Sequence, residues 1–489
     1  MADLSLLLVV ACVAIPVLAA LLCILPVPHR VREAITLGSS VLTAAAIVLL
    51  LLRGHLPIRA IDDTVYVDGL SLVVVVVAGL VYLLAGVAAF GYFTHGRPVP
   101  DLPLTSWRFH IMFNLFAATV LCVPLTGNLL VLWIAVEATT VTSALLVGLE
   151  HSEGALEAAW KYILIASAGL LIGLLGLLLL YTAGARVLGP DYSPTYAELL
   201  RVATRLPAHT VLVAFALIVI GFGTKAGLVP MHTWLPDAHS EGPTPVSAML
   251  SGALLGAAMY AIFRVEPIAS GALGGAIPHD LLYLFGTLSM VLSGLLALRQ
   301  VNLKRLYAYS SIEHMGILAL GAAFGTPLAL YGVMLHLVAH GATKALAFFG
   351  AGSVRQRFGS ADGRSVTGLN RLMPATAFFL LVGVFAISGV PPAALFRSEL
   401  TILVGGAGQR MFVFVAVLLI FANLVFLGGL RLVNRMTFSE ARPGQPRGEV
   451  NRMLLLAMAC AVVPAVLLTF YIPPPLNDVF TQAAQVLSR

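Results

Sequence analysis

The sequence contains very little charge for its length. Only 10% of its 489 residues are Asp, Glu, Lys or Arg, whereas 60% are hydrophobic, and the mean hydropathy is +0.98. Soluble proteins carry about 25% charged and roughly 45–50% apolar residues. A depletion of this size excludes a soluble enzyme, a disordered chain and a secreted disulfide scaffold, and it predicts a protein with several membrane-spanning helices.

Cysteine is also scarce, and several functional motifs are missing. Four cysteines lie far apart within apolar stretches. Because no C-x-x-C pair occurs, the sequence predicts neither an iron–sulfur cluster nor a zinc site in the chain. The phosphate-binding pattern G-x-x-x-x-G-K-[ST] is absent, which argues against an ATP-driven pump. The net charge of +6 includes no basic cluster on a soluble domain, so nucleic acid is not expected as a partner.

Apolar stretches of about 20 residues, enough to span a bilayer as a helix, recur along the chain. We expect an all-α polytopic membrane protein with about fourteen transmembrane helices joined by short loops. The candidates lie near 3–25, 32–52, 70–93, 109–126, 128–149, 156–182, 209–229, 244–264, 278–299, 302–324, 327–353, 374–403, 410–434 and 452–472. No Lys or Arg precedes the first stretch, and it is longer than the apolar part of a signal peptide, so it is interpreted as a spanning helix.

Lys and Arg are unevenly distributed between the two sides of this predicted bundle. One set of loops and helix ends, which includes Arg97, holds about twice as many as the opposite set, which includes Arg489. Since basic residues favour the cytoplasmic side, we expect both termini to lie outside.

The ionisable residues inside the helices form a repeated pattern. Corresponding residues of helices 4–8 and 9–13 are Glu137 with Glu313, Lys161 with Lys344, and Lys225 with Glu399. The last pair lies beside prolines that break the seventh and twelfth helices. Broken helices at matching places in two halves indicate the ion sites of transporters, and charges in membrane helices usually mark ion pathways.

A repeat of five helices crosses the membrane an odd number of times, so the second unit is expected upside down relative to the first. We therefore predict two inverted half-channels. The expected regions are three N-terminal helices at 1–108, the first half-channel at 109–264, the second at 278–434, and a C-terminal helix and tail at 435–489.

Glu137 and Lys225 are candidates for a coupled pair. Glu137 lies near the middle of its helix, where a lone carboxylate would stay neutral and a nearby lysine would restore its charge. A buried lysine can take up and release protons. The alternative is a purely structural ion pair between helices.

The polar segment after Lys225 contains His232 and His239 within KAGLVPMHTWLPDAHSEGPTPVSAMLSG. This segment is expected to form a water-accessible mouth leading to Lys225, although an ordinary polar loop at the membrane surface would have the same composition. The two histidines are seven residues apart, which makes a metal site there a weak prediction.

His336, His340 and Lys344 follow one another at i, i+4 and i+8, so they lie on one helix face over about 12 Å. Three ionisable groups in a membrane helix favour a proton relay over histidines that merely pack in a core. Histidines at i and i+4 could also bind a metal, but no carboxylate or cysteine in the helix completes the set.

Glu313 and His314 lie deep in the tenth predicted helix. Lys304 and Arg305 begin that helix, and they serve equally well as topology anchors or as pathway residues. Glu399 is a candidate for the ion exit of the second half-channel, with snorkelling to the membrane surface as the alternative.

The motifs HTWLPDAHSEGPTPVSAML, LKRLYAYSSIEHMG and GVPPAALFRSE, together with Glu137 and Lys225, occur in order over helices 4–13. In them the sequence resembles the antiporter-like membrane subunits shared by respiratory complex I, Mrp-type cation/proton antiporters and membrane-bound hydrogenases. The glutamate of SSIEHMG, the length and the lack of a C-terminal lateral helix are most similar to the hydrogenase-4 component F branch of this family.

The resemblance implies a proton-translocating, non-redox subunit of an oxidoreductase complex of the hydrogenase or NADH:quinone type, without an active site of its own. It implies further antiporter-like subunits and peripheral hydrogenase-like subunits as partners, which would hold the iron–sulfur and nickel–iron centres, while this chain holds no cofactor. A bacterial inner membrane is the implied location. The alternative is an Mrp-like Na⁺/H⁺ antiporter subunit without redox coupling.

By the same resemblance, Glu137 and Lys225 would form the coupled pair of the first half-channel. Lys344 and the histidines would lie on the central polar axis, with Glu399 as the terminal residue. One departure affects this route, because Gly256 stands where complex I relatives carry a basic residue. Water or another residue, such as Lys161, would then bridge the gap. A second is Ala393-Ala394 in place of an aromatic residue and glycine.

Overall fold

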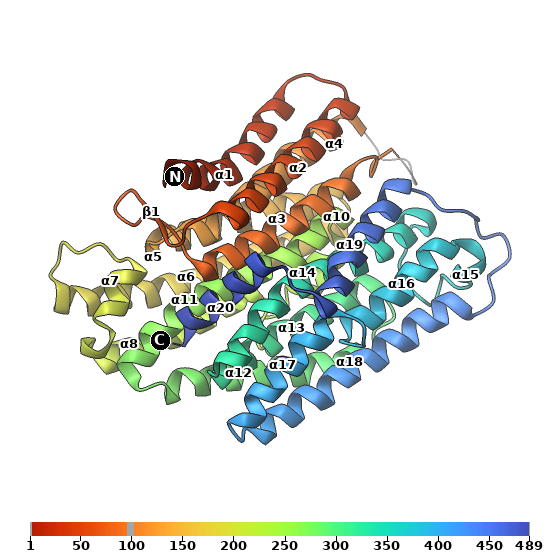
Figure 1. Cartoon of the computed structure of the whole chain (residues 1–489). Helices are drawn as coiled ribbons and strands as arrows, with labels where there is room; N and C mark the ends of the chain where they lie inside the picture. Colours follow the sequence, from red (N-terminus) through yellow and green to blue (C-terminus); the bar gives the residue numbers. More distant parts are fainter. Residues whose placement is uncertain (1, 95–101, 489) are drawn as a thin grey trace.

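The computed structural model describes residues 2–94 and 102–488, and these are almost entirely helical (Figure 1). Arg97 and Arg489, which entered the prediction of orientation, lie outside the described residues. The one sheet in the described part is a hairpin of β1 (Ile58–Ala60) and β2 (Val65–Val67), in which Ile58 pairs with Val67. The prediction of an all-α membrane protein is therefore confirmed, apart from this small hairpin.

The described residues form twenty α-helices. They are α1 Ala2–Ile24, α2 His29–Arg53, α3 Gly69–Ala89, α4 Leu102–Cys122, α5 Leu129–Val147, α6 Glu153–Leu188, α7 Tyr196–Arg201, α8 Ala208–Ala226, α9 Leu235–Glu241, α10 Thr244–Met249, α11 Leu255–Leu273, α12 Ala276–Ala297, α13 Leu303–Phe324, α14 Pro327–Phe358, α15 Leu369–Leu372, α16 Pro374–Ile387, α17 Ala394–Gly408, α18 Phe412–Phe438, α19 Arg452–Phe470 and α20 Pro474–Leu487. A π-helical segment, η4 (Leu250–Leu254), joins α10 to α11.

Among the described residues, twelve helical segments are long and apolar enough to cross a membrane. They coincide with twelve of the fourteen predicted stretches. The other two stretches form α13, whose sequence is more polar, and the pair α16 and α17, each too short by itself. The protein is thus a multi-pass membrane protein, and fourteen crossings remain a prediction.

Two helices are broken where the sequence places proline beside an ionisable residue. α8 ends at Ala226, one residue after Lys225, and Gly227 then adopts φ +80°, which an L-residue rarely does. α16 ends at Ile387, and the chain turns at Gly389 (φ +61°) before α17 begins. Both breaks leave backbone groups without helical partners inside the bundle, where side chains can use them.

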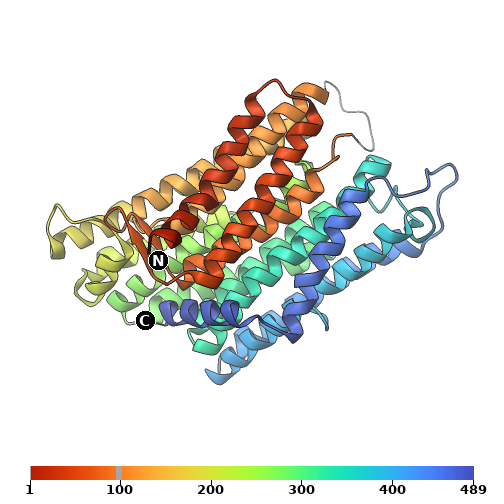
Figure 2. The ribbon, with the colours of Figure 1, turned by 45° about the horizontal axis from the view of Figure 1, so that its top comes forward.

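The longest helices at the centre are enclosed by others. The membrane-length windows of α14 and of the segment from α10 to α11 are entirely buried, whereas those of α1, α18 and α19 are mostly exposed. α14 packs against α3, α13, α16, α17 and α19, and Figure 2 shows it passing through the middle of the bundle. Ionisable residues of α14 therefore face protein, and the exposed apolar residues of the outer helices form the surface expected towards lipid.

The start of α3 is tied to α11 by a buried ion pair. Asp68 caps α3 by accepting a hydrogen bond from the Ser71 amide, and Arg264 donates to both oxygens of Asp68 at 2.5 and 2.7 Å. Burial by itself raises the pKa of Asp68, but the charge and hydrogen bonds of Arg264 outweigh it and hold that pKa below its usual range. This contact fixes one end of the N-terminal helices against the central ones.

The C-terminal region holds more structure than the sequence indicated. Where only a tail was expected after α19, residues 474–487 form α20, which packs against α3 and α14. Its buried residues follow an i, i+3, i+4 pattern from Leu476 through Val479, Phe480, Ala483 and Leu487. Both ends of the chain lie towards the same end of the bundle in Figures 1 and 2.

Candidate functional site

Lys225 lies in the last turn of α8, fully buried just before the break. Its ammonium group donates to the Thr140 hydroxyl at 2.9 Å and to the Tyr162 hydroxyl at 2.5 Å. Tyr162 also presents its ring 4.7 Å from the Lys225 nitrogen. Among the described residues, Lys225 has no ion-pair partner within 4.0 Å, so it is held by neutral groups.

Glu137 reaches Lys225 through one hydroxyl group. On α5, Thr140 lies one turn after Glu137 and donates to its carboxylate at 3.4 Å, while it accepts from Lys225. Ser167 on α6 donates to the other carboxylate oxygen at 2.6 Å. The predicted pair is thus brought together, with Thr140 between the two charges in place of a direct salt bridge.

Tyr162 continues the contacts of Lys225 on its other side. Its hydroxyl is 2.7 Å from that of Ser143, and its ring stacks on Trp234 at 4.4 Å between centroids. The Trp234 indole donates to the Thr224 carbonyl, which the break in α8 leaves accessible. The aromatic pair therefore holds Lys225 in place through shape and hydrogen bonds.

Lys161 does not lie with this buried group. Its side chain is 45% exposed and forms ion pairs with Glu157 at 2.6 Å and Asp237 at 3.2 Å. Asp237 also accepts from Arg305 at 2.9 Å. The residue that occupies the buried position beside Lys225 is its neighbour Tyr162.

His232 and His239 follow the break, on the turn and on α9. The His232 Nδ1 atom and both ring nitrogens of His239 are buried without a hydrogen-bond partner. His239 lies between the rings of Trp234 and Phe348 and interacts electrostatically with Lys344. Buried nitrogens of this kind need water or a proton carrier as partner.

Lys344 is the second fully buried lysine, in the middle of α14. Its ammonium group donates to the Tyr307 carbonyl of α13 at 3.0 Å, and it too has no ion-pair partner within 4.0 Å among the described residues. Glu313 on α13 is buried with one carboxylate oxygen unpartnered, and it interacts electrostatically with Lys344. Lys304, at the start of α13, is also buried and donates to the Gly242 carbonyl at 2.6 Å.

Three histidines gather beside Lys344. His314 of α13 and His336 of α14 are joined by a 3.1 Å hydrogen bond, and the His340 ring centre is 5.0 Å from that of His314. His336 also contacts the Ser398 hydroxyl at 3.0 Å. The predicted face of α14 is thus completed by a histidine from another helix.

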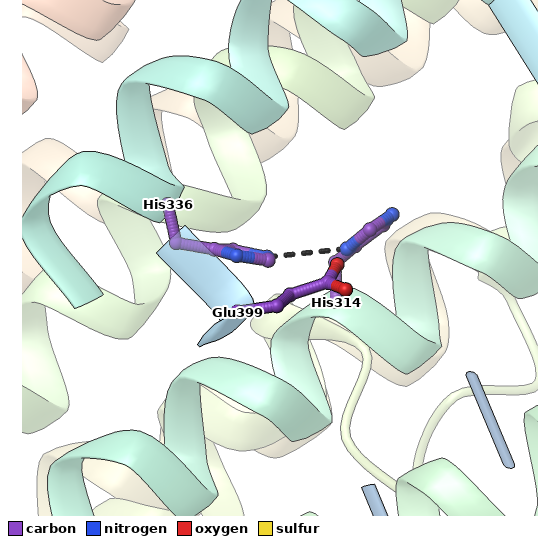
Figure 3. Close-up of side chains that lie close together, drawn as sticks. All are labelled: His314, His336 and Glu399. Atoms are coloured by element: carbon purple, nitrogen blue, oxygen red, sulfur yellow. Dashed lines mark hydrogen bonds between the residues drawn. The ribbon is translucent and has the colours of Figure 1, made fainter. Parts of the chain in front are cut away.

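Glu399 of α17 lies against this pair. One ligand atom from each of Glu399, His314 and His336 lies within 4.8 Å of the others, and all three side chains are buried (Figure 3). Sequence spacing suggested that no carboxylate accompanies the histidines of α14, yet the fold places Glu399 beside His336. Gly389, at the preceding break, has no side chain where a Cβ would overlap the Glu399 carboxylate.

Gly256 opens α11 immediately after the π-helical segment η4. A Cβ there would meet only Leu337 of α14 within 4 Å. Near it, the Ser251 hydroxyl of η4 lies 2.7 Å from that of Ser311 on α13. Ser311 shares the Tyr307 carbonyl with Lys344, so hydroxyl groups link the two halves where the basic residue is missing.

Sequence reasoning did not identify Thr140, Tyr162, Ser251, Ser311 or Ser398. Hydroxyl residues are common in membrane helices, where they also join helices to one another. The one available signal was local, because Thr140 lies one helical turn from Glu137 and Ser398 directly precedes Glu399.

Comparison with known proteins gives a consistent picture. Residues 126–425 match the family described as NADH:quinone oxidoreductase/Mrp antiporter, TM. A protein of Methylacidiphilum infernorum (isolate V4), named hydrogenase-4 component F homolog, is 32% identical over 425 residues, which are 86% of this chain and 88% of that protein.

Two solved structures share the fold. A chain of the membrane-bound sulfane sulfur reductase (MBS), an archaeal respiratory membrane complex, has a TM-score of 0.86 and 25% identity, over 98% of this chain and 97% of the other. A chain of the Mrp complex from Dietzia sp. DQ12-45-1b has a TM-score of 0.85 over 99% and 97%, and its 21% identity speaks for the fold alone.

Proposed function

This chain belongs to the family of antiporter-like membrane subunits of complex I, Mrp antiporters and membrane hydrogenases, and we propose that it carries protons across a bacterial inner membrane for a multisubunit redox complex. The observation that carries the proposal is the pair of fully buried lysines, Lys225 and Lys344, each held by neutral oxygens with a carboxylate at one remove. A lysine kept out of water without a direct counter-ion is suited to exchanging its proton.

The first half-channel comprises residues 109–264. Water reaches Lys225 from the segment containing His232 and His239, and Thr140 transmits the charge of Glu137 to it. The second half-channel comprises residues 278–434 in inverted orientation. In it, Lys344 passes its proton through Glu313 and the histidines His314, His336 and His340 to Glu399.

The two halves are joined at Gly256 by hydroxyl groups in place of a basic side chain. The contact of Ser251 with Ser311 leads towards the Tyr307 carbonyl and Lys344. Water between these hydroxyls would complete the path. Lys161, exposed and engaged by two carboxylates, would serve at the mouth, beside Asp237.

The energies involved are of the right size for coupling. Two unit charges 4 Å apart interact by about 4 kcal/mol at an effective dielectric constant of 20. Moving one charge against the membrane potential costs about 2.3 kcal/mol per 100 mV. A change in partner subunits that shifts Glu137 relative to Lys225 could therefore drive one proton forward against an ordinary membrane potential.

Partner subunits would carry the redox chemistry. The named relative is a hydrogenase-4 component homolog, and a structural neighbour comes from a respiratory membrane complex. We infer iron–sulfur and nickel–iron centres in peripheral subunits, further antiporter-like subunits in the membrane, and both termini of this chain on the outer side. The shared fold with the Mrp complex favours one alternative, a Na⁺/H⁺ antiporter subunit without redox coupling.

The proposal is tested by Lys225→Ala, with Arg186→Ala on the exposed end of α6 as control. Proton uptake is measured in proteoliposomes of the complex isolated with the chain, under a potassium diffusion potential. Loss of uptake in the first variant and not in the second is expected. Normal assembly of Lys225→Ala with unchanged uptake would refute the mechanism.

The choice between the two complexes depends on the companions of the chain. A tagged copy is isolated from its native membrane in mild detergent, and the co-purifying proteins are identified by mass spectrometry. Companions with cysteine motifs for nickel–iron or iron–sulfur centres are expected. Companions consisting only of antiporter-like subunits would favour Na⁺/H⁺ exchange, which acidification or alkalinisation on adding Na⁺ would then test.

A further inference from the structure

His314, His336 and Glu399 come from three different helices and meet at one buried point (Figure 3). The His314 Nδ1 and His336 Nε2 atoms are 3.1 Å apart, and a Glu399 oxygen lies within 4.8 Å of both. Two imidazoles and one carboxylate are the donor set of many three-ligand zinc sites, which leave a fourth position for water.

The remaining ring nitrogens fix where the imidazole protons lie. His314 Nε2 is 3.1 Å from the Ile387 carbonyl, which can only accept, so this nitrogen carries a proton. The Ser398 hydroxyl uses its single hydrogen towards the Leu395 carbonyl at 2.8 Å, so it accepts from His336 Nδ1 at 3.0 Å. In neutral histidines, both outward nitrogens are then protonated.

This arrangement leaves two lone pairs facing each other. His314 Nδ1 and His336 Nε2 are acceptors when the outward nitrogens hold the protons, and two acceptors at 3.1 Å repel unless a cation lies between them. Ligating histidines in metal sites have the same surroundings, with the other N–H donated to a carbonyl or another oxygen that orients the ring.

Charge at the point is also favourable for a cation. Glu399 contributes one carboxylate, and Glu313, next to His314 in the chain, is buried nearby and interacts electrostatically with Glu399. One Glu313 oxygen has no hydrogen-bond partner. Two carboxylates together can balance a divalent ion, which lowers the cost of burying its charge.

We propose that His314, His336 and Glu399 form a binding site for a divalent transition metal ion of the Zn²⁺ class. Nitrogens bound to a tetrahedral zinc at 2.0–2.1 Å are about 3.3 Å apart, close to the spacing already present. Imidazole donors select such metals over Na⁺, Mg²⁺ or Ca²⁺, which prefer oxygen. Under the proposed function, on which this consequence rests, the bound metal stops protons at Glu399.

Binding is measured on the purified complex in detergent, first with Co²⁺, whose visible spectrum reports tetrahedral coordination, and then with Zn²⁺ in competition. We expect His336→Ala, His314→Ala and Glu399→Gln each to weaken binding by at least 100-fold. Ser398→Ala, which removes an orienting partner, is expected to weaken it about 10-fold. His340→Ala is the matched control, since it removes a neighbouring imidazole of α14 outside the triad and should leave the affinity unchanged.

Variants that fail to assemble do not remove the test, because X-ray absorption at the zinc edge of the unaltered complex should show two imidazoles and an oxygen ligand. Absence of binding, which would leave the histidines sharing only a proton, overturns the proposal. Binding that survives all three triad variants overturns it as well. Zn²⁺ binding that depends on the triad but leaves proton uptake unchanged would confirm the site and refute the proton route through Glu399.

Discussion

Replacing Thr140 by valine removes one hydroxyl group and nearly preserves the shape of the side chain. In the structure this hydroxyl accepts from Lys225 at 2.9 Å and donates to Glu137 at 3.4 Å. A hydrogen bond to a charged group contributes about 1.5–3 kcal/mol. If the Thr140 contact steadies the charged lysine during transfer, its loss slows proton uptake by about 10- to 100-fold, at tenfold per 1.4 kcal/mol.

The assay is proton uptake into proteoliposomes, driven by a potassium diffusion potential and followed with an entrapped pH-sensitive dye. Thr140→Ser retains the hydroxyl and should restore most of the rate. Thr142→Val is the matched control, because this threonine on the same helix bonds to Thr119 and to backbone carbonyls and not to Lys225. Equal rates for Thr140→Val and the unaltered protein would refute the view that Thr140 couples Glu137 to Lys225.

Three further predictions concern positions that the structure singles out. Tyr162→Phe removes the 2.5 Å contact with Lys225 but keeps the ring, so proton uptake should fall by about 5- to 10-fold, for the ~1 kcal/mol of one hydrogen bond; a rate as low as that of Lys225→Ala would contradict this division of roles. Gly389→Ala places a Cβ against the Glu399 carboxylate at a left-handed backbone position, which alone costs about 1–2 kcal/mol, and uptake should be lost while Gly408→Ala, with open space around it, remains active. Asp68→Asn leaves Arg264 buried without its counter-ion and should destabilise the protein by about 3–5 kcal/mol, measured by unfolding with a thiol-reactive dye. Because the pKa of Asp68 is lowered in the fold, its contribution is complete above the unfolded value of about 3.9 and is lost as the pH falls through the lower folded value, so the two unfolding curves should converge in acid and not at neutral pH.

The sequence predicted the class of protein and most of its helices because the bilayer imposes a strong and local constraint. An apolar stretch long enough to span hydrocarbon must form a helix, since its backbone groups have no water to bind. The same constraint made Lys225, Lys344 and Glu399 conspicuous, as charge is rare in such stretches. It could not separate α16 from α17 or identify α20, whose helices depend on proline, glycine and packing against neighbours.

Lys161 illustrates the limit of spacing arguments. Its number in the repeat matched Lys344, yet one residue along a helix turns the side chain by about 100°, and the fold points Tyr162, not Lys161, at Lys225. Similarly, a search for metal ligands within α14 considered only residues of one helix. The carboxylate beside His336 comes from α17, sixty-three residues later in the chain.

Composition, hydropathy and motifs by themselves determined that this is a polytopic membrane protein of the antiporter-like family with ionisable residues along its core, because each of these properties is written in consecutive residues. Only the tertiary structure decided that Thr140 lies between Glu137 and Lys225, that Ser251 and Ser311 connect the halves beside Gly256, and that His314, His336 and Glu399 share one point. Such contacts depend on how helices far apart in the chain rotate and pack against one another, and no local pattern specifies that angle.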